Sequence, residues 1–161
     1  IVAEKEPKRP FDVALDYLTK CARSEKEVKD KLYKKGYTTD EINDTLSKLK
    51  EYHFIDDKEY IKTFLSFYKS KFGEKQLEMK LTLVKGVDKE LVKEVLSEQL
   101  DENEEIEKAT NFAKKYFTQK KLDFSRESVA KVGNWLYGKG FNWRVIGKAM
   151  SNLKIEIEEN E

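Results

Sequence analysis

The chain has almost no cysteine or histidine, the residues that form disulfides and structural zinc sites. Cys21 is the only cysteine among 161 residues and His53 is the only histidine. The sequence therefore excludes an internal disulfide and argues against a zinc site. The glycine-rich loops GxxxxGK[ST] and GxGxxG, which bind nucleotides, are missing too. Because no second histidine or cysteine-based dyad accompanies His53, we interpret it as structural and expect neither a cofactor nor an enzymatic activity.

Long apolar runs are also missing. No stretch approaches the ~18 consecutive apolar residues of a membrane span, and no signal peptide is visible. We therefore expect no contact with a membrane and a reducing cytoplasm as the compartment. Only two prolines and seven glycines occur, whereas 39% of the residues are charged. This composition indicates a helix-rich protein with a heavily solvated surface.

One short signature occurs three times: "LYKKGY" at 32–37, "LTLVKGV" at 81–87 and "LYGKGF" at 136–141. Its glycines, Gly36, Gly86 and Gly140, suit the position just after a helix, where a left-handed backbone favours glycine. The apolar residue that follows then folds back onto the last turn of the helix. We interpret all three glycines as helix stops.

The ten residues after each glycine match without gaps. In all three repeats a helix-capping residue is followed by two apolar residues on one helical face. The capping residues are Thr38, Asp88 and Asn142, the first apolar residues are Ile42, Val92 and Ile146, and the second are Leu46, Leu96 and Met150. Ahead of the second glycine, the match needs one inserted residue. Repeats spaced by 50 and 54 residues indicate a repeated supersecondary unit.

Each unit is expected to hold three helices. "SEKE" at 24–27 is a capping box, Asp56 can cap the restart of the pattern, and either Ser125 or Ser128 begins the second helix of the third unit. We predict an all-α fold of three tandem three-helix, helix-turn-helix-like repeats that form an elongated, curved array. The expected boundaries are 11–55, 56–101 and 102–154, with flexible ends at 1–10 and 155–161.

Charge is distributed unevenly along the chain although the net charge is only +1. Six acids and no base lie between residues 98 and 107, whereas residues 108–154 hold eleven Lys or Arg against two acids. Within this basic segment, Lys108, Lys114, Lys115 and Lys121 are predicted to lie opposite the apolar face of one helix. Such a stripe suits phosphates or an acidic protein surface. The alternative is a solvated face balanced by the neighbouring acids.

The two tryptophans occupy positions that are polar in the other repeats. Trp143 aligns with Thr39 and Lys89, and Trp135 aligns with Lys31 and Lys80. One hypothesis is that they are contact aromatics, either interface anchors or stacking platforms for bases. The other is that they provide extra packing peculiar to a terminal repeat.

Taken in order, "ARSEKEVKDKLYKKGY" at 22–37, "FIDDKEYIKTF" at 54–64 and "LYGKGF" at 136–141 resemble RecX, the family of bacterial recombination regulators. The likeness spans about residues 14–153. It implies a non-enzymatic protein that binds RecA filaments on single-stranded DNA, lies in the filament groove, and inhibits ATP hydrolysis, filament extension, strand exchange and coprotease activity. We expect a monomer, with direct DNA contact left open. The candidate contact residues are Arg23, Lys108, Lys114, Lys115, Lys121, Arg126, Trp135, Lys139, Trp143 and Arg144.

Two other functions compete with this one. Helix-turn-helix geometry in each unit would suit a stand-alone DNA-binding array, although only the third repeat is strongly basic. A scaffold that binds a peptide is the third possibility, but it leaves the basic segment without a role.

Overall fold

The computed structural model describes residues 6–161, and the only regular secondary structure in this part of the chain is helical, with no strand. The all-α prediction is confirmed. The described elements are, in chain order, α1 (Pro10–Lys20), α2 (Glu25–Lys34), α3 (Thr39–Glu51), α4 (Asp57–Tyr68), α5 (Glu74–Met79), the π-helical turn η1 (Lys80–Val84), α6 (Lys89–Gln99), α7 (Glu102–Lys120), α8 (Arg126–Gly138) and α9 (Trp143–Glu159).

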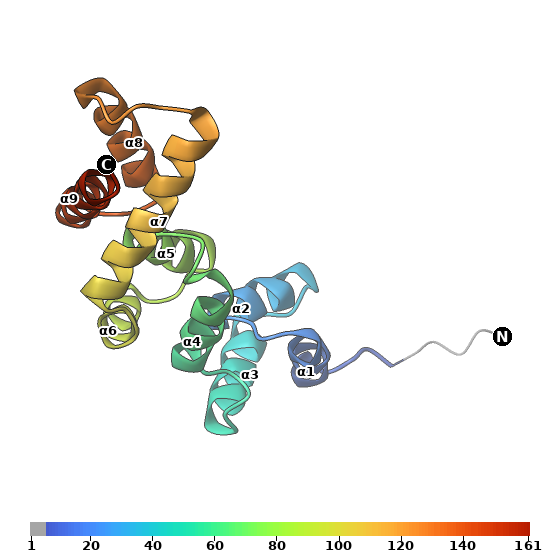
Figure 1. Cartoon of the computed structure of the whole chain (residues 1–161). Coiled ribbons are helices and arrows are strands. Elements are labelled where there is room, and N and C mark those ends of the chain that lie inside the picture. The colour runs from blue at the N-terminus through green and yellow to red at the C-terminus, as the bar shows by residue number, and fades with distance from the viewer. Residues whose placement is uncertain (1–5) are drawn as a thin grey trace.

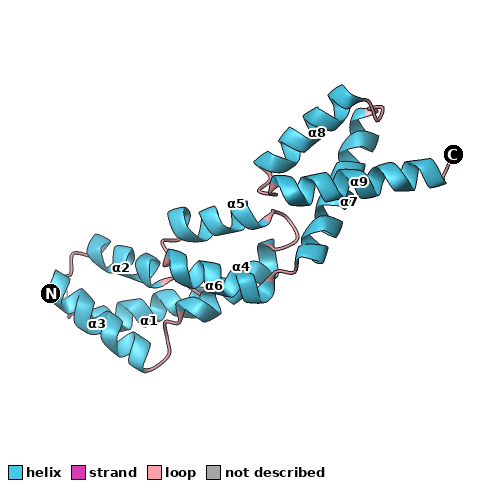
Figure 2. Cartoon of the chain, turned by 90° about the vertical axis from the view of Figure 1, so that its left-hand side faces the viewer, coloured by secondary structure: helices cyan, strands magenta, loops and turns pink. Residues whose placement is uncertain are grey.

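These elements form three units that follow one another along an elongated molecule (Figures 1 and 2). The units are α1–α3, α4–α6 with η1, and α7–α9, and we call them repeats 1, 2 and 3. Each has a hydrophobic core of its own, built around Leu32 in repeat 1, Leu81 in repeat 2 and Leu136 in repeat 3. All extensively packed helix pairs lie within a single repeat. Hydrophobic burial therefore stabilises each repeat separately.

The three glycine stops are confirmed by the backbone. Gly36, Gly86 and Gly140 have φ angles of 89°, 68° and 104°. The residue after each glycine donates its N–H back to the preceding helix, as Phe141 does to the Leu136 carbonyl at 3.2 Å. The next helix then begins at Thr38, Asp88 or Asn142, whose side chain accepts from the third backbone N–H of that helix.

The inserted residue of the second repeat is accommodated by η1. Here the N–H of Lys85 reaches the carbonyl of Lys80, five residues back, at 3.0 Å. A π turn takes up one extra residue without breaking the helix. As a result Leu81 stays in the core, fully buried, and its carbonyl still accepts from the N–H of Val87.

Two further helix ends use a residue other than glycine. His53 has a φ of 60° and Lys121 a φ of 50°, and both lie one residue before an N–H that returns to the last turn of the helix. His53 thus ends α3, which accounts for it structurally.

The chain ends differ in part from expectation. Residues 1–5 lie outside the described residues, and Pro10 already belongs to α1. Residues 155–159, expected in a flexible end, continue α9. The reason is that the long α7 gives α9 a partner to pack against, and Lys114 on α7 forms an ion pair with Glu156 on α9.

Neighbouring repeats are joined where their second helices meet end to end. At the junction of repeats 2 and 3, the N–H of Gly73 donates to the Lys139 carbonyl at 2.8 Å, and the N–H of Lys75 donates to the Gly140 carbonyl at 3.0 Å. At the junction of repeats 1 and 2, the Ser24 hydroxyl donates to the Lys85 carbonyl at 2.7 Å. Donors at the start of α2 thus satisfy a carbonyl at the end of η1, and donors at the start of α5 satisfy carbonyls at the end of α8. The dipoles of the joined helices align.

A carboxylate completes each junction. Asp57 accepts from the N–H of Glu25 at 2.9 Å, and Glu105 accepts from the N–H of Glu74 at 3.2 Å. Both carboxylates stand four residues before a fully buried residue of the first helix of their repeat, so they occupy the same register. Burial raises the pKa of Asp57 above its ordinary value. Polar contacts at helix ends, rather than a shared apolar core, therefore connect the repeats.

Candidate partner-binding surface on the third repeat

The predicted stripe of four lysines divides into three environments. Lys108 is not displayed: its side chain is 14% exposed and forms an ion pair with Glu105. Its ammonium also donates to the carbonyls of Lys69 and Phe72, at 2.7 and 2.9 Å. The expectation is corrected for Lys108, because α7 turns this position toward repeat 2 rather than toward solvent. Lys108 holds the repeats together.

The other three lysines remain on the surface. Lys114 is 55% exposed and pairs with Glu156. Lys115 and Lys121 are exposed and form no ion pair with any described residue. The basic character of repeat 3 is therefore carried partly by cations that are free to meet a partner.

The two tryptophans have different roles. Trp135 is half-buried and packs against Phe112 and Tyr116, with ring centroids 6.2 and 4.7 Å away. Trp143 is 55% exposed and stacks in parallel on Tyr137, itself 57% exposed, at a centroid distance of 5.0 Å. Trp135 thus provides packing in the terminal repeat, whereas the Trp143–Tyr137 pair presents a flat aromatic surface to solvent.

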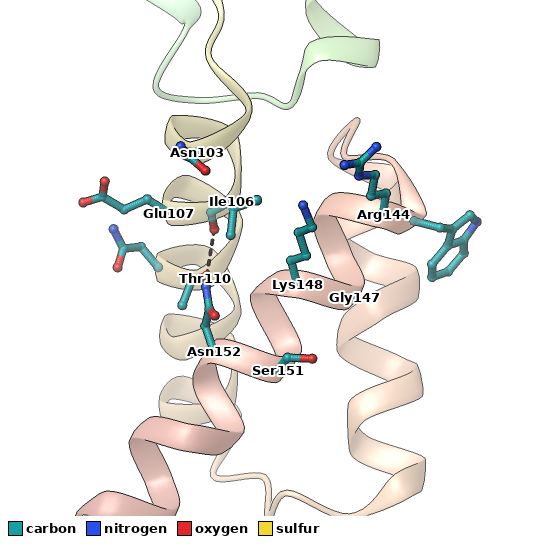
Figure 3. A pocket seen from close by; sticks show the side chains of 11 residues that line it. Asn103, Ile106, Glu107, Thr110, Arg144, Gly147, Lys148, Ser151 and Asn152 are labelled. Atoms are coloured by element: carbon teal, nitrogen blue, oxygen red, sulfur yellow. Dashed lines mark hydrogen bonds between the residues drawn. The ribbon is translucent and has the colours of Figure 1, made fainter.

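A groove of about 690 Å³ runs between α7 and α9, next to Trp143 (Figure 3). The α7 side presents Asn103, Thr110 and Asn111, and the α9 side is lined by Trp143, Arg144, Gly147, Lys148, Ser151 and Asn152. Gly147 leaves the groove open, since a β-carbon there would have nothing within 4 Å. In the close-up view, Lys148 reaches into the space between the two helices, whereas Glu107 points away from α9.

One carboxylate from α7 links the two cations of this groove. Glu102 lies 3.1 Å from Arg144 Nε and 3.0 Å from Lys148 Nζ. The hydrogen bond from Lys148 lowers the pKa of Glu102 below its ordinary value. Both cations remain accessible, with side chains 72% and 48% exposed. The arrangement shows that this pair of cations can bind a carboxylate.

The three remaining candidates lie elsewhere. Arg23 forms an ion pair with Glu27 at 3.2 Å and lies over the Tyr17 ring at 4.4 Å, which makes it chiefly a structural residue of repeat 1. Arg126 is exposed at the first position of α8. Lys139 is half-buried at the end of α8, over the rings of Trp135 and Phe72. The structure therefore groups Trp143 and Arg144, but it leaves Arg23 far from them along the chain.

Sequence reasoning missed two sets of residues. The junction residues Gly73 and Glu105 act across repeats, and only the shared register of Asp57 and Glu105 could have identified the carboxylates. The groove residues Gly147 and Lys148 could have been found by comparing the third helices position by position. The residues that the structure describes include no group of acids, histidines or cysteines placed to hold a metal, and no helix long and apolar enough to cross a membrane.

The fold defines a protein built of tandem three-helix repeats. The family model for the first three-helix domain of RecX matches residues 11–49. Regulatory protein RecX of Bacillus licheniformis is 34% identical over 156 residues, which cover 94% of this chain and 58% of that protein. Regulatory protein RecX of Caldanaerobacter subterraneus is 30% identical over 147 residues, 91% of this chain and 71% of that protein. The chain belongs to the RecX family of regulatory proteins.

Solved structures agree with this assignment. The crystal structure of RecX from Lactobacillus salivarius has a TM-score of 0.83 and 27% identity, covering 91% of this chain and 95% of that one. The chain spans 58% and 59% of the length of the RecX proteins of Bacillus licheniformis and Bacillus subtilis, somewhat more than half.

Proposed function

We propose that the chain is a non-enzymatic regulator that binds RecA filaments on single-stranded DNA. Lying in the filament groove, it inhibits ATP hydrolysis, filament extension, strand exchange and coprotease activity. The observation that carries the proposal is the match to regulatory RecX proteins over 91–96% of the chain.

The architecture supports this role. Three repeats joined at helix ends form an elongated body that can follow a helical groove (Figure 2). Because the junctions are polar and local, small rotations between repeats cost little buried apolar area. The basic surface of repeat 3 supplies charge for an acidic protein surface or for phosphates.

Stand-alone DNA binding is less well supported. In a helix-turn-helix reading, the third helix of each repeat would enter the major groove. The first turns of α3 and α6 carry acids, Asp40, Glu41 and Glu90, which repel phosphates. Only α9 lacks acids there.

The test is the DNA-dependent ATPase of RecA on single-stranded DNA, with and without this chain. We expect suppression at concentrations well below that of RecA, because blocking a filament requires few molecules per filament. The chain is added to preassembled filaments, and its affinity for bare single-stranded DNA is measured in parallel. Unchanged hydrolysis at equimolar folded chain rejects the proposal. Suppression that appears only where the chain displaces RecA from DNA favours the DNA-binding alternative.

A further inference from the structure

The groove between α7 and α9 holds residues that run against the local preferences of a helix. The third helices of the repeats share one register, so each position of α9 has counterparts in α3 and α6. Arg144 corresponds to Asp40 and Glu90, and Lys148 corresponds to Asp44 and Glu94. The charge at both positions is therefore reversed in repeat 3 alone.

Arg144 is unfavourable for α9 itself. It occupies the second helical position, where the helix dipole favours an acid and disfavours a base. Repeats 1 and 2 place Asp40 and Glu90 there. Helix stability does not explain this residue.

Gly147 is also unfavourable for the helix, but because of its low helix propensity. A glycine inside a helix is destabilising relative to alanine, because it loses more backbone freedom on folding. The counterparts of Gly147 are Asn43 and Lys93, and no atom of the described chain approaches closely enough to require a missing side chain. Gly147 thus breaks a local rule without a structural gain, and Arg144 gains only a solvent-exposed ion pair with Glu102. Such residues are expected at binding sites.

We propose that this groove receives an extended segment of the RecA filament that bears a carboxylate. The identity of this partner rests on the proposed function. Arg144 and Lys148 bind that carboxylate in exchange for Glu102, and Gly147 admits the segment between the helices. In the free chain Glu102 forms ion pairs with both cations, 3.1 Å from Arg144 Nε and 3.0 Å from Lys148 Nζ.

The lining favours a peptide over a nucleic-acid backbone. Asn103, Asn111, Ser151 and Asn152 form no side-chain hydrogen bond with any described residue, so their donors and acceptors are free. A peptide backbone offers both donors and acceptors, whereas phosphates only accept. Glu102 offsets one of the two positive charges, and Glu107 at the α7 edge adds a second negative charge, so the groove attracts a polyanion only weakly.

A photo-crosslinking side chain at the rim tests this assignment. Ser151 lines the groove, and Ser47 holds the same register in repeat 1, also exposed. Each is replaced in turn by a diazirine amino acid in the full chain, which is bound to RecA on single-stranded DNA and irradiated. We expect Ser151 to yield adducts with RecA, mapped by mass spectrometry to a segment with an Asp or Glu, and Ser47 to yield at least fivefold fewer. Adducts with the DNA, or equal yields from both positions, overturn the proposal.

Filling the groove gives a second readout. Gly147→Leu should weaken filament binding at least tenfold while helicity is kept and the unfolding midpoint is kept or raised, because a β-carbon at this position meets no described atom within 4 Å and glycine is unfavourable inside a helix. Asn43→Leu is the matched control and should bind normally. Normal binding by Gly147→Leu overturns the groove assignment alone. Absence of filament binding by the unmodified chain overturns the proposed function, and this assignment falls with it.

Discussion

Repeats 1 and 3 share a backbone plan but differ in what surrounds it. Both end their second helix with a left-handed glycine, Gly36 or Gly140, and both begin the third helix with a capping side chain. The Gly36 end is open, since a β-carbon there would meet nothing within 4 Å. At Gly140, a β-carbon would lie 2.5 Å from the backbone nitrogen of Gln76. Residues within each repeat therefore determine its backbone, whereas contact with the neighbouring repeat adds a packing requirement at Gly140 in repeat 3.

The first helices differ in the same way. Lys108 in repeat 3 reaches across the junction to carbonyls of repeat 2, and the same register holds Tyr60 in repeat 2, whose hydroxyl donates to Glu27 at 3.0 Å. In repeat 1 this register is Val13, which packs against its own core. The same position therefore packs against the core in repeat 1, whereas in repeats 2 and 3 it contacts the preceding repeat.

The largest effect is expected from Lys108→Gln. It leaves Glu105 buried without its cation, and removing one partner of a buried pair costs about 3–5 kcal/mol. Tyr60→Phe is the matched change at the other junction and should cost about 1.5 kcal/mol, because only one hydrogen bond is lost. Chemical denaturation measures both. Equal and small losses would show that Lys108 does not connect the repeats.

Comparing Gly140→Ala with Gly36→Ala separates the cost of backbone strain, which both variants share, from the cost of steric crowding at the junction, which only Gly140→Ala adds. Both place a β-carbon in the left-handed region, which costs roughly 1–2 kcal/mol. Gly140→Ala also forces the junction open, and we expect a total near 3 kcal/mol by adding an overpacking cost of about 1–3 kcal/mol. Denaturant midpoints compare the two variants, and equal losses would contradict the closed junction.

Gly138→Ala should stabilise the chain by up to about 1 kcal/mol. Gly138 is the last residue of α8, its counterpart in repeat 1 is Lys34, and an added β-carbon would meet nothing within 4 Å. Its carbonyl still accepts from Gln76 after the change. Thermal unfolding provides the measurement, and a loss of stability would place the helix stop at Gly138 instead of Gly140.

The smallest effect concerns Glu74 and depends on pH. Burial, followed by the charge of Glu105, raises the pKa of Glu74 above its ordinary value near 4.5. The folded chain therefore binds this proton more tightly than the unfolded chain, and stability falls as pH rises through the interval between the two values. Glu74→Gln should add only up to about 0.5 kcal/mol at pH 7, since Glu74 is only partly desolvated and solvent screens its charge. The gain should vanish below about pH 4, where both states are protonated. A gain that persists there would exclude ionisation as its cause.

Features set by nearby residues could be predicted from the sequence. The glycine stops, the capping residues and the need for one inserted residue all follow from a few consecutive positions. The burial of Lys108 could not be predicted, because helical periodicity places it on the polar side and only the end of α4 makes that side internal. For Trp135 the sequence left packing and partner contact open, because its packing on Tyr116 depends on how α8 lies against α7.

The most direct test exchanges the groove face of α9 for its counterpart in α3. The variant carries Arg144→Asp, Gly147→Asn and Lys148→Asp, and the control carries Asp40→Arg, Asn43→Gly and Asp44→Lys. Inhibition of the RecA ATPase on single-stranded DNA is titrated with each chain after circular dichroism confirms its helicity. We expect the α9 variant to require at least tenfold more protein for half-inhibition, a loss of about 1.4 kcal/mol, and the control to match the unmodified chain. Full inhibition by the α9 variant, or an equal loss in the control, would contradict partner binding through the third repeat.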